Sequence, residues 1–151
     1  MKVWGVDPGL NGALACFDHL VGTLTIHDMP TMEVNKKRHV NAQLVESILS
    51  LDHAAVFIER VGAMPGQGVS SMFSFGRSYG VVIGVAAGLQ MPTTLVSPQV
   101  WQKAVRCQKG KDASRQRACE VFPAFAKLFA RKKDDGRSDA ALLAYYATFV
   151  G

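Results

Sequence analysis

Long hydrophobic runs are missing from this sequence: none approaches the length of about 18 apolar residues that a membrane-spanning helix needs. Its first residues lack both the regions of a signal peptide and the Arg- and Ser-rich composition of a transit peptide, so we expect no leader. Cysteine is scarce as well. Cys16, Cys107 and Cys119 form no CxxC pair and no Cys/His cluster, which argues against a disulfide framework and a zinc site. We expect a cytoplasmic protein with reduced thiols and no membrane partner, from a bacterial or phage-infected cell; an organelle is the alternative if a transit peptide has been removed.

The composition is that of an ordinary globular protein. Of the 151 residues, 48% are hydrophobic and 19% are charged, which argues against a disordered or fibrous chain. A chain of this length corresponds to one domain and can bury about 70% of the surface that its unfolded state exposes. We therefore expect a single domain over residues 1–151.

Acidic residues are few, and the net charge of +5 is unevenly spread. Residues 97–133 hold ten basic and two acidic side chains, a net charge of +8, which leaves −3 for the rest of the chain. A basic segment on a mildly acidic body indicates a polyanionic partner, and a solvated helical face is the alternative. Phe122, Phe125 and Phe129 are spaced like a buried helical stripe rather than a platform for stacking bases.

The pattern of apolar residues predicts both strands and helices. Alternating or short apolar runs predict strands at residues 2–7, 13–18, 22–28, 54–58 and 92–96. Periodic apolar runs predict helices at residues 40–51, 69–89, 98–105, 113–122, 123–130 and 135–149. Loops are expected at residues 29–38, 62–68 and 108–112. The long apolar run at 69–89, rich in small residues, is typical of a buried helix.

Residues suited to helix starts support these boundaries. Asn41 or His39 can begin the first helix, and Ser97 followed by Pro98 is a favourable start for the third. The order of elements indicates a mixed α/β layout, in which three antiparallel strands precede strands that alternate with helices. We expect a five-stranded mixed sheet, three antiparallel strands and then parallel strands, flanked by helices on both faces.

Three acidic sites stand out by their place in these elements. Asp7 ends the first predicted strand and Glu59 follows the fourth, and open α/β sheets bind ligands beyond the carboxyl ends of their strands. Asp135 and Asp139 lie four residues apart in the last predicted helix, so they share one face at about 6 Å from each other. The helix macrodipole accounts for Asp134 and Asp135 near a helix start, but it accounts poorly for Asp139 a full turn further in.

A pocket that gathered these carboxylates would be unfavourable unless cations neutralised it. Oxygen ligands without His or Cys indicate Mg²⁺ or Mn²⁺. Two such ions about 4 Å apart can activate a water and stabilise the leaving 3′ oxygen in phosphodiester hydrolysis. The carboxylates would then hold metal ions while the basic segment holds phosphates, and both signals indicate a metal-dependent nuclease.

Five segments also carry a resemblance to a known family. They are GVDPGLNGALA at 5–15, FIERVGAMPGQG at 57–68, FGRSYGVVIG at 75–84, VSPQVWQKAV at 96–105 and DDGRSDAALLA at 134–144. In this order they resemble the RuvC-type Holliday junction resolvases of the RNase H-like superfamily, most closely the phage and chloroplast branches, whose last motif is similar to DGRxxA. The resemblance spans nearly the whole chain. It implies an RNase H-like fold and a crossover junction endodeoxyribonuclease.

The resemblance also implies the roles of single residues. It makes three residues catalytic metal ligands: Asp7, Glu59 and Asp139. The bacterial spacing of three would put the fourth ligand at Gly136, which has no side chain to offer. Asp135 matches the phage- and chloroplast-like spacing and is preferred to Asp134. Lys111 matches a catalytic basic position near the scissile phosphate, and a surface lysine at a helix start is the equal alternative.

Partners are implied in the same way: a four-way or branched DNA, and a second copy of the chain, so that two active sites cut two strands symmetrically. In the family the dimer surface involves the long helix, here within 69–89, although its small residues would equally suit packing inside one subunit. Met64 and Gln67, in the loop at 62–68, would enter the junction as a wedge and as a partner of adenine edges, unless this loop is a plain connector. The basic residues expected to contact DNA are Arg77, Lys109, Lys111 and Arg115.

Three other functions stay open at this point. A ribosomal-RNA-processing nuclease of the YqgF type would share the superfamily and act on RNA precursors. A small ATP-binding module would use Asp7 and the following Pro-Gly as a phosphate loop, but it would need a second phosphate loop and an adenosine pocket. A non-catalytic branched-DNA-binding protein would gain nothing from carboxylates that face phosphates.

Overall fold

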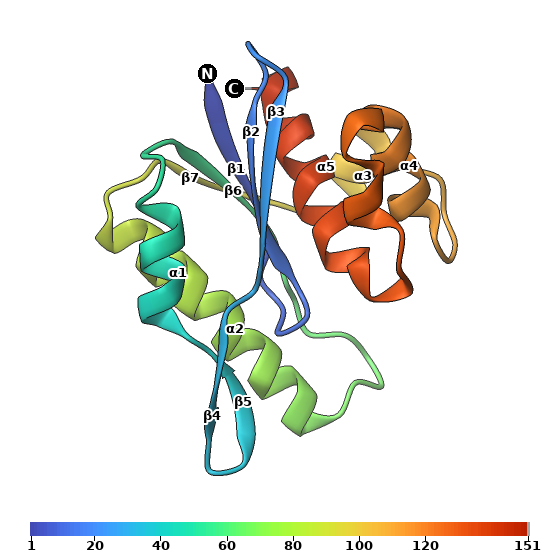
Figure 1. Cartoon of the computed structure of the whole chain (residues 1–151). Helices are drawn as coiled ribbons and strands as arrows, with labels where there is room; N and C mark the ends of the chain where they lie inside the picture. Colours follow the sequence, from blue (N-terminus) through green and yellow to red (C-terminus); the bar gives the residue numbers. More distant parts are fainter. Residues whose placement is uncertain (151) are drawn as a thin grey trace.

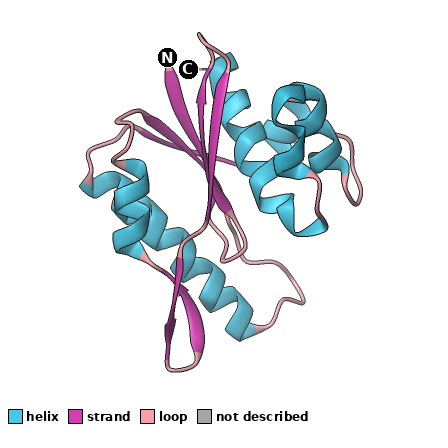
Figure 2. Ribbon diagram, viewed as in Figure 1, coloured by secondary structure: helices cyan, strands magenta, loops and turns pink. Residues whose placement is uncertain are grey.

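The computed structural model describes residues 1–150 and contains a large and a small β-sheet, with helices on both faces of the large one (Figures 1 and 2). The large sheet has the strand order β3-β2-β1-β6-β7. Its strands are β1 (Lys2–Asp7), β2 (Ala13–Asp18), β3 (Thr23–Asp28), β6 (Ala55–Glu59) and β7 (Thr93–Val96). The first three pair antiparallel, whereas β6 pairs parallel with β1 and β7 parallel with β6. The predicted five-stranded mixed sheet is confirmed.

Two helical layers bury opposite faces of this sheet. The helices are α1 (Ala42–Leu49), α2 (Val69–Gly88), α3 (Pro98–Ala104), α4 (Ala113–Val121) and α5 (Asp135–Val150). Because side chains alternate along a strand, Trp4 and Val6 of β1 join the core shared with α1 and α2. Val3, one position over, joins the core shared with α3, α4 and α5. Figure 1 shows the two layers on either side of the strands.

The last helix lies directly on the central strand. A Cβ at Gly5 would be 2.2 Å from the carbonyl oxygen of Ala140 and 2.4 Å from the amide nitrogen of Ala144, so only glycine allows this approach. The residues of α5 at the contact are small and fully buried. This close packing fixes the acidic start of α5 over the carboxyl end of β1.

Burial of the long helix differs from the expectation. Of α2, only Ser78, Val82 and Ala86 are buried, so the prediction of a buried helix at 69–89 is wrong. The chain covers one stripe of α2 and leaves apolar residues such as Val69 and Phe73 exposed. The helix starts agree better, because the Asn41 side chain accepts a hydrogen bond from the backbone of α1, as expected of an N-cap.

The prediction of a loop over residues 29–38 is wrong as well. In that region β4 (Thr31–Val34) and β5 (Lys37–Val40) pair as an antiparallel hairpin that projects beside α2 (Figure 1). Its two turn residues, Asn35 and Lys36, both have positive φ, which is the turn geometry that matches the twist of a hairpin. The sequence pattern does not predict this hairpin because its turn has no glycine. In addition, most side chains of the two strands are exposed rather than alternately buried.

The segment between α4 and α5 is helical, as predicted, but in a tighter form. It contains the 3₁₀ helices η1 (Pro123–Phe129) and η2 (Lys132–Asp134). Phe122 and Phe129 are buried and Phe125 packs against the same core, which confirms the predicted aromatic stripe. Within residues 1–150, no helix combines the length and the apolar character needed to cross a membrane.

Candidate active site

Asp7 and Glu59 are brought side by side by the pairing of two parallel strands. Val6 is opposite Ile58 in the register of β1 and β6, so the next residue of each strand lies at the same edge of the sheet. Both carboxylates also share the face of Phe57, because side chains two residues apart point the same way. That face is the one covered by α3 and α5, so the strand order alone directs two acids toward the acidic start of α5.

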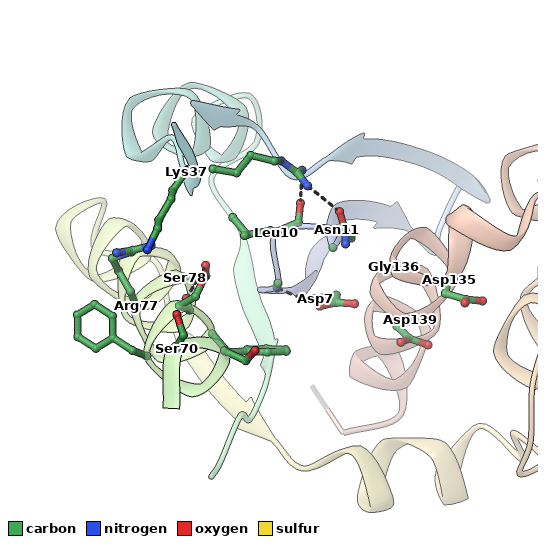
Figure 3. Close-up of a pocket in the computed structure, with 17 residues that line it drawn as sticks. Asp7, Leu10, Asn11, Lys37, Ser70, Arg77, Ser78, Asp135, Gly136 and Asp139 are labelled. Atoms are coloured by element: carbon green, nitrogen blue, oxygen red, sulfur yellow. Dashed lines mark hydrogen bonds between the residues drawn. The ribbon is translucent and has the colours of Figure 1, made fainter. Parts of the chain in front are cut away.

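Asp139 approaches this edge from α5 (Figure 3). Gly136, one turn earlier, packs on the turn after β1, where a Cβ would be 2.3 Å from the carbonyl oxygen of Asn11. This contact and the contact of α5 with Gly5 hold Asp139 over Asp7. A ligand side chain at position 136, where a spacing of three would put it, has no room.

Each strand-end carboxylate accepts one fixed hydrogen bond. The backbone N–H of Gly9 donates to Oδ1 of Asp7 at 3.1 Å. The indole Nε1 of Trp101, in α3, donates to Oε2 of Glu59 at 2.8 Å. Trp101 is fully buried, so its bond to Glu59 is shielded from competing water. These two bonds set the orientation of the carboxylates before any ligand arrives.

Burial raises the pKa of all three carboxyl groups, and repulsion from neighbouring carboxylates adds to it for Glu59 and Asp139. Burial raises the pKa of Asp7 above its ordinary value. Burial, and then the charge of Asp7, raise the pKa of Glu59 to about 7. Burial, with the charges of both neighbours, raises the pKa of Asp139 to about 8. Within residues 1–150 none of the three forms an ion pair with Lys or Arg, so no basic side chain of the described chain balances their charge when they ionise.

The structure separates the two aspartates at the start of α5. Asp134 is 1% exposed and lies 2.8 Å from Nη2 of Arg131 and 3.8 Å from Nη1 of Arg137. Asp135 is 63% exposed, lies 3.3 Å from Nε of Arg115 and lines the cavity over the carboxylates. Asp134 therefore forms ion pairs within the protein, whereas Asp135 is accessible to a ligand in the cavity.

An open cavity of about 770 Å³ lies over the carboxylates. Asp7, Asp135 and Asp139 line one side of it, whereas Lys37 of β5 and Arg77 of α2 line the other (Figure 3). The cavity therefore has an acidic and a basic side. Such a pairing suits an anionic chain whose charge is met partly by cations held at the carboxylates and partly by basic side chains.

The donor set fits a divalent cation in type and charge. It consists of carboxylate oxygens alone, the ligands that Mg²⁺ and Mn²⁺ prefer, and its repulsion is what a cation would relieve. In the present conformation, no group of three or more His, Cys, Asp or Glu side chains within residues 1–150 is positioned to hold a metal ion.

The predicted DNA-contacting residues are spread over several elements. Lys109 and Lys111 are exposed in the turn before α4 and do not line the 770 Å³ cavity. Arg115 is only 12% exposed, and its guanidinium is engaged by Asp112, by Asp135 and by the carbonyl groups at the end of η1. The structure thus places Arg115 as a link between α4, η1 and the start of α5.

The loop between β6 and α2 carries the other two predicted contacts. Met64 is exposed at its tip. Gln67 is partly buried and lines a small cavity of about 130 Å³ with Phe75 and Tyr79. Nearby on α2, the guanidinium of Arg77 lies 5.5 Å from the centre of the exposed ring of Phe73. This end of α2 presents apolar and basic groups together to solvent.

Sequence reasoning missed two residues at the site. Trp101 lies within the quoted segment at 96–105 but is not singled out there, because no local pattern links it to Glu59. Arg38 was assigned to a loop, yet it donates hydrogen bonds to Oδ1 of Asn11 at 3.0 Å and to the carbonyl oxygen of Leu10 at 3.1 Å. The sequence signal for Arg38 is the run of three basic residues at 36–38, which lies outside the basic segment at 97–133.

The chain has the fold of RuvC over its whole length. It superposes on Thermus thermophilus RuvC in complex with a Holliday junction substrate with a TM-score of 0.69 and 16% identity, covering 100% of this chain and 97% of that one. A second T. thermophilus RuvC structure gives 0.64 and 17%, with 99% and 97% covered. No protein-family model and no curated protein matches the sequence. The likeness establishes the RuvC and RNase H-like fold, and the phage or chloroplast branch stays a prediction.

Proposed function

We propose that the chain is a metal-dependent endonuclease that resolves four-way DNA junctions by paired, symmetric nicks. The observation that carries this proposal is the convergence of Asp7, Glu59 and Asp139 from β1, β6 and α5, where each raises the pKa of a neighbour or has its own pKa raised and none pairs with Lys or Arg within residues 1–150. The RuvC fold supports it, since one solved structure with this fold is a complex with a Holliday junction substrate.

Four carboxylates would hold two Mg²⁺ or Mn²⁺ ions: Asp7, Glu59, Asp135 and Asp139. Such ions, when bound, supply an activated water and stabilise charge on the leaving 3′ oxygen. The chain keeps Asp7 and Glu59 in fixed orientations through the Gly9 N–H and the Trp101 indole. Asp135 exchanges its contact with Arg115 for the ligand, which its exposure permits.

Contacts with DNA are proposed on both sides of the carboxylates. Arg77 lines the basic side of the cavity and would hold the strand next to the cleaved phosphate. Met64 and Gln67 would enter the junction from the loop beyond Glu59, and the exposed Lys109 would hold the phosphates of a junction arm. Lys111 keeps its proposed role near the scissile phosphate.

A second copy of the chain is proposed to pack on α2. A Cβ at Gly76, Gly80 or Gly84 would meet nothing within 4 Å, so the alternative that these glycines serve packing inside one subunit is wrong. Exposed Val69 and Phe73 extend this uncovered surface. A two-fold dimer would present two active sites to two strands of a junction, as symmetric nicking requires.

The test is strand-resolved cleavage of a synthetic four-way junction, with each strand end-labelled in turn. The proposal expects nicks at matching positions in two opposing strands, none in a linear duplex of the same sequence, and products that ligase can seal. Cleavage of structured RNA alone would instead indicate an RNA-processing nuclease. Tight junction binding without any cleavage would indicate a binding protein.

A further inference from the structure

The β4–β5 hairpin carries a compact group of positive charge. Lys36 lies in its two-residue turn, Lys37 and Arg38 begin β5, and all three are exposed. The one acid of the hairpin, Glu33, is opposite Arg38 in the strand register. Within residues 1–150 none of these basic residues forms an ion pair. Their charge is therefore available to an external anion.

Two of these residues reach the candidate active site. Lys37 and Arg38 both line the 770 Å³ cavity, and Lys37 lies with Arg77 of α2 on the side opposite Asp7 and Asp139 (Figure 3). The hairpin and α2 thus supply one basic wall from two separate parts of the chain. A phosphate held there would lie close to a phosphate held at the carboxylates, because both would sit in one cavity.

Arg38 also touches the turn that follows Asp7. Its Nη1 donates to Oδ1 of Asn11 at 3.0 Å and its Nη2 donates to the carbonyl oxygen of Leu10 at 3.1 Å. Both acceptors are uncharged, so the guanidinium binds the turn while keeping its charge. The same turn packs against Gly136 at the start of α5. Arg38 therefore fixes the segment on which the spacing between β1 and α5 depends.

The basic wall continues past Arg38. A second cavity of about 650 Å³ adjoins the first and shares Arg38 and Asn11 with it. Lys132 and Lys133 of η2 also line it, and of its three acids Asp28 and Asp134 are paired with Arg137 and Arg131. A strand that passes over the carboxylates would meet basic side chains on both sides of the turn after β1.

We propose that the β4–β5 hairpin is a DNA-backbone-binding element of the active site, in which Lys36 and Lys37 hold phosphates beside the one to be cut and Arg38 positions the Leu10–Gly12 turn. This role rests on the proposed function, since it takes branched DNA as the polyanion. Phosphate contacts hold a strand in register without reading its sequence. The hairpin accordingly sets where the strand lies over the carboxylates, and Arg38 joins that contact to the catalytic turn.

The test compares three substitutions in the full-length chain. Lys36→Gly removes a charge and places glycine where φ is positive, so the turn is kept. Lys37→Gln removes the neighbouring charge. Lys2→Gln is the matched control, because Lys2 lies at the opposite end of β1 from the active site and pairs with Asp52. Binding of a fluorescent four-way junction is measured in EDTA, which prevents cleavage, at several salt concentrations.

We expect Lys36→Gly and Lys37→Gln each to weaken junction binding about threefold to tenfold and to lower the slope of log K against log salt by about 1. Lys2→Gln should bind like the wild type. If both hairpin variants match Lys2→Gln while the wild type binds and cuts junctions, the hairpin role is wrong and the proposed function stands. If the wild type neither binds nor cuts any junction, the proposed function is wrong and the hairpin role is wrong with it.

Arg38 is tested as a positioning residue by separating rate from affinity. Arg38→Gln should lower the single-turnover cleavage rate at saturating junction by more than tenfold, a larger factor than its loss of affinity. Arg38→Lys, which can still make one of the two bonds, should recover part of the rate. If Arg38→Gln loses affinity alone, or if Arg38→Lys is no faster than Arg38→Gln, the positioning role is contradicted. Thermal unfolding of each variant shows that the comparison is made on folded protein.

Discussion

Trp101 donates a 2.8 Å hydrogen bond from its indole Nε1 to Oε2 of Glu59, which joins α3 to the end of β6. The indole is fully buried, so no water replaces this bond when it is lost. Burial and the charge of Asp7 raise the pKa of Glu59 to about 7, although this bond acts to lower it. The bond therefore favours the ionised carboxylate and fixes its orientation at the end of β6.

Trp101→Phe should therefore impair cleavage more than folding. It removes the N–H while keeping an aromatic ring, and we expect a cleavage rate at least about tenfold lower and a free energy of unfolding lower by about 2 kcal/mol. Single-turnover cleavage and urea unfolding measure the two effects. Trp4→Phe is the matched control, since buried Trp4 donates to the carbonyl oxygen of Asp52 at 2.8 Å on the other face of the sheet. Equal loss of rate in both variants would contradict the positioning of Glu59 by Trp101.

Asp134 and Asp135 should behave in opposite ways. Asp134→Asn breaks a buried ion pair with Arg131, so it should lower the free energy of unfolding by about 2 kcal/mol and reduce cleavage little in protein that remains folded. Asp135→Asn changes an exposed carboxylate and should alter stability by no more than about 0.5 kcal/mol while lowering the cleavage rate by about 100-fold. Cleavage assays beside chemical unfolding test both. A reversed pattern would make Asp134 the fourth ligand.

Stability of the metal-free protein should fall as the pH rises from about 5 to about 8. In this range the unfolded chain has released its carboxyl protons, whereas the folded chain keeps those of Glu59 up to about 7 and of Asp139 up to about 8. The folded state binds more protons, so the free energy of unfolding decreases with pH. The Tm in EDTA measures this dependence, and Asp139→Asn should flatten it. Added Mg²⁺ should raise the Tm more at about pH 8 than at about pH 5, because metal ions and protons compete for these oxygens. A Tm that rises over this range in EDTA would contradict the raised pKa values.

Gly136→Ala should disturb both folding and cleavage. A Cβ at this position would be 2.3 Å from the carbonyl oxygen of Asn11, so the turn after β1 or the start of α5 must move. We expect a free energy of unfolding lower by about 3 kcal/mol, and a cleavage rate that falls with the displaced acids. Gly88→Ala, at the end of α2 where a Cβ meets nothing, is the control and should stabilise the chain by up to about 1 kcal/mol. Unchanged stability of Gly136→Ala would contradict the close packing at this turn.

The local pattern of apolar residues was enough to predict the large sheet and the acids at its edge. Asp7 and Glu59 lie at the ends of strands that the apolar pattern predicts. The rule that ligands bind beyond strand ends identifies both as candidate site residues. The pattern could not decide between Asp134 and Asp135, because adjacent residues at a helix start differ only in which way the helix turns them. Only the packing of α5 on β1 buries one and exposes the other.

Contacts between segments that are distant in the sequence could not be predicted from local sequence patterns. The bond from Trp101 to Glu59 joins residues 42 apart, and the bond from Arg38 to Asn11 joins residues 27 apart. Neither leaves a periodic signal. The hairpin that carries Arg38 was missed because its strands are short and exposed, and its turn adopts positive φ without glycine. Stability there comes from pairing rather than from an alternating apolar face.

The most direct test is metal-dependent cleavage of a labelled four-way junction by the wild type and by Asp7→Asn, with Mg²⁺, Mn²⁺ or EDTA. Asp52→Asn, which changes an aspartate paired with Lys2 at the far end of β1, serves as the matched control. We predict paired symmetric nicks by the wild type and by Asp52→Asn with either metal ion, and none in EDTA or by Asp7→Asn. Cleavage by Asp7→Asn at the wild-type rate, or cleavage that persists in EDTA, would contradict a nuclease site built on these carboxylates.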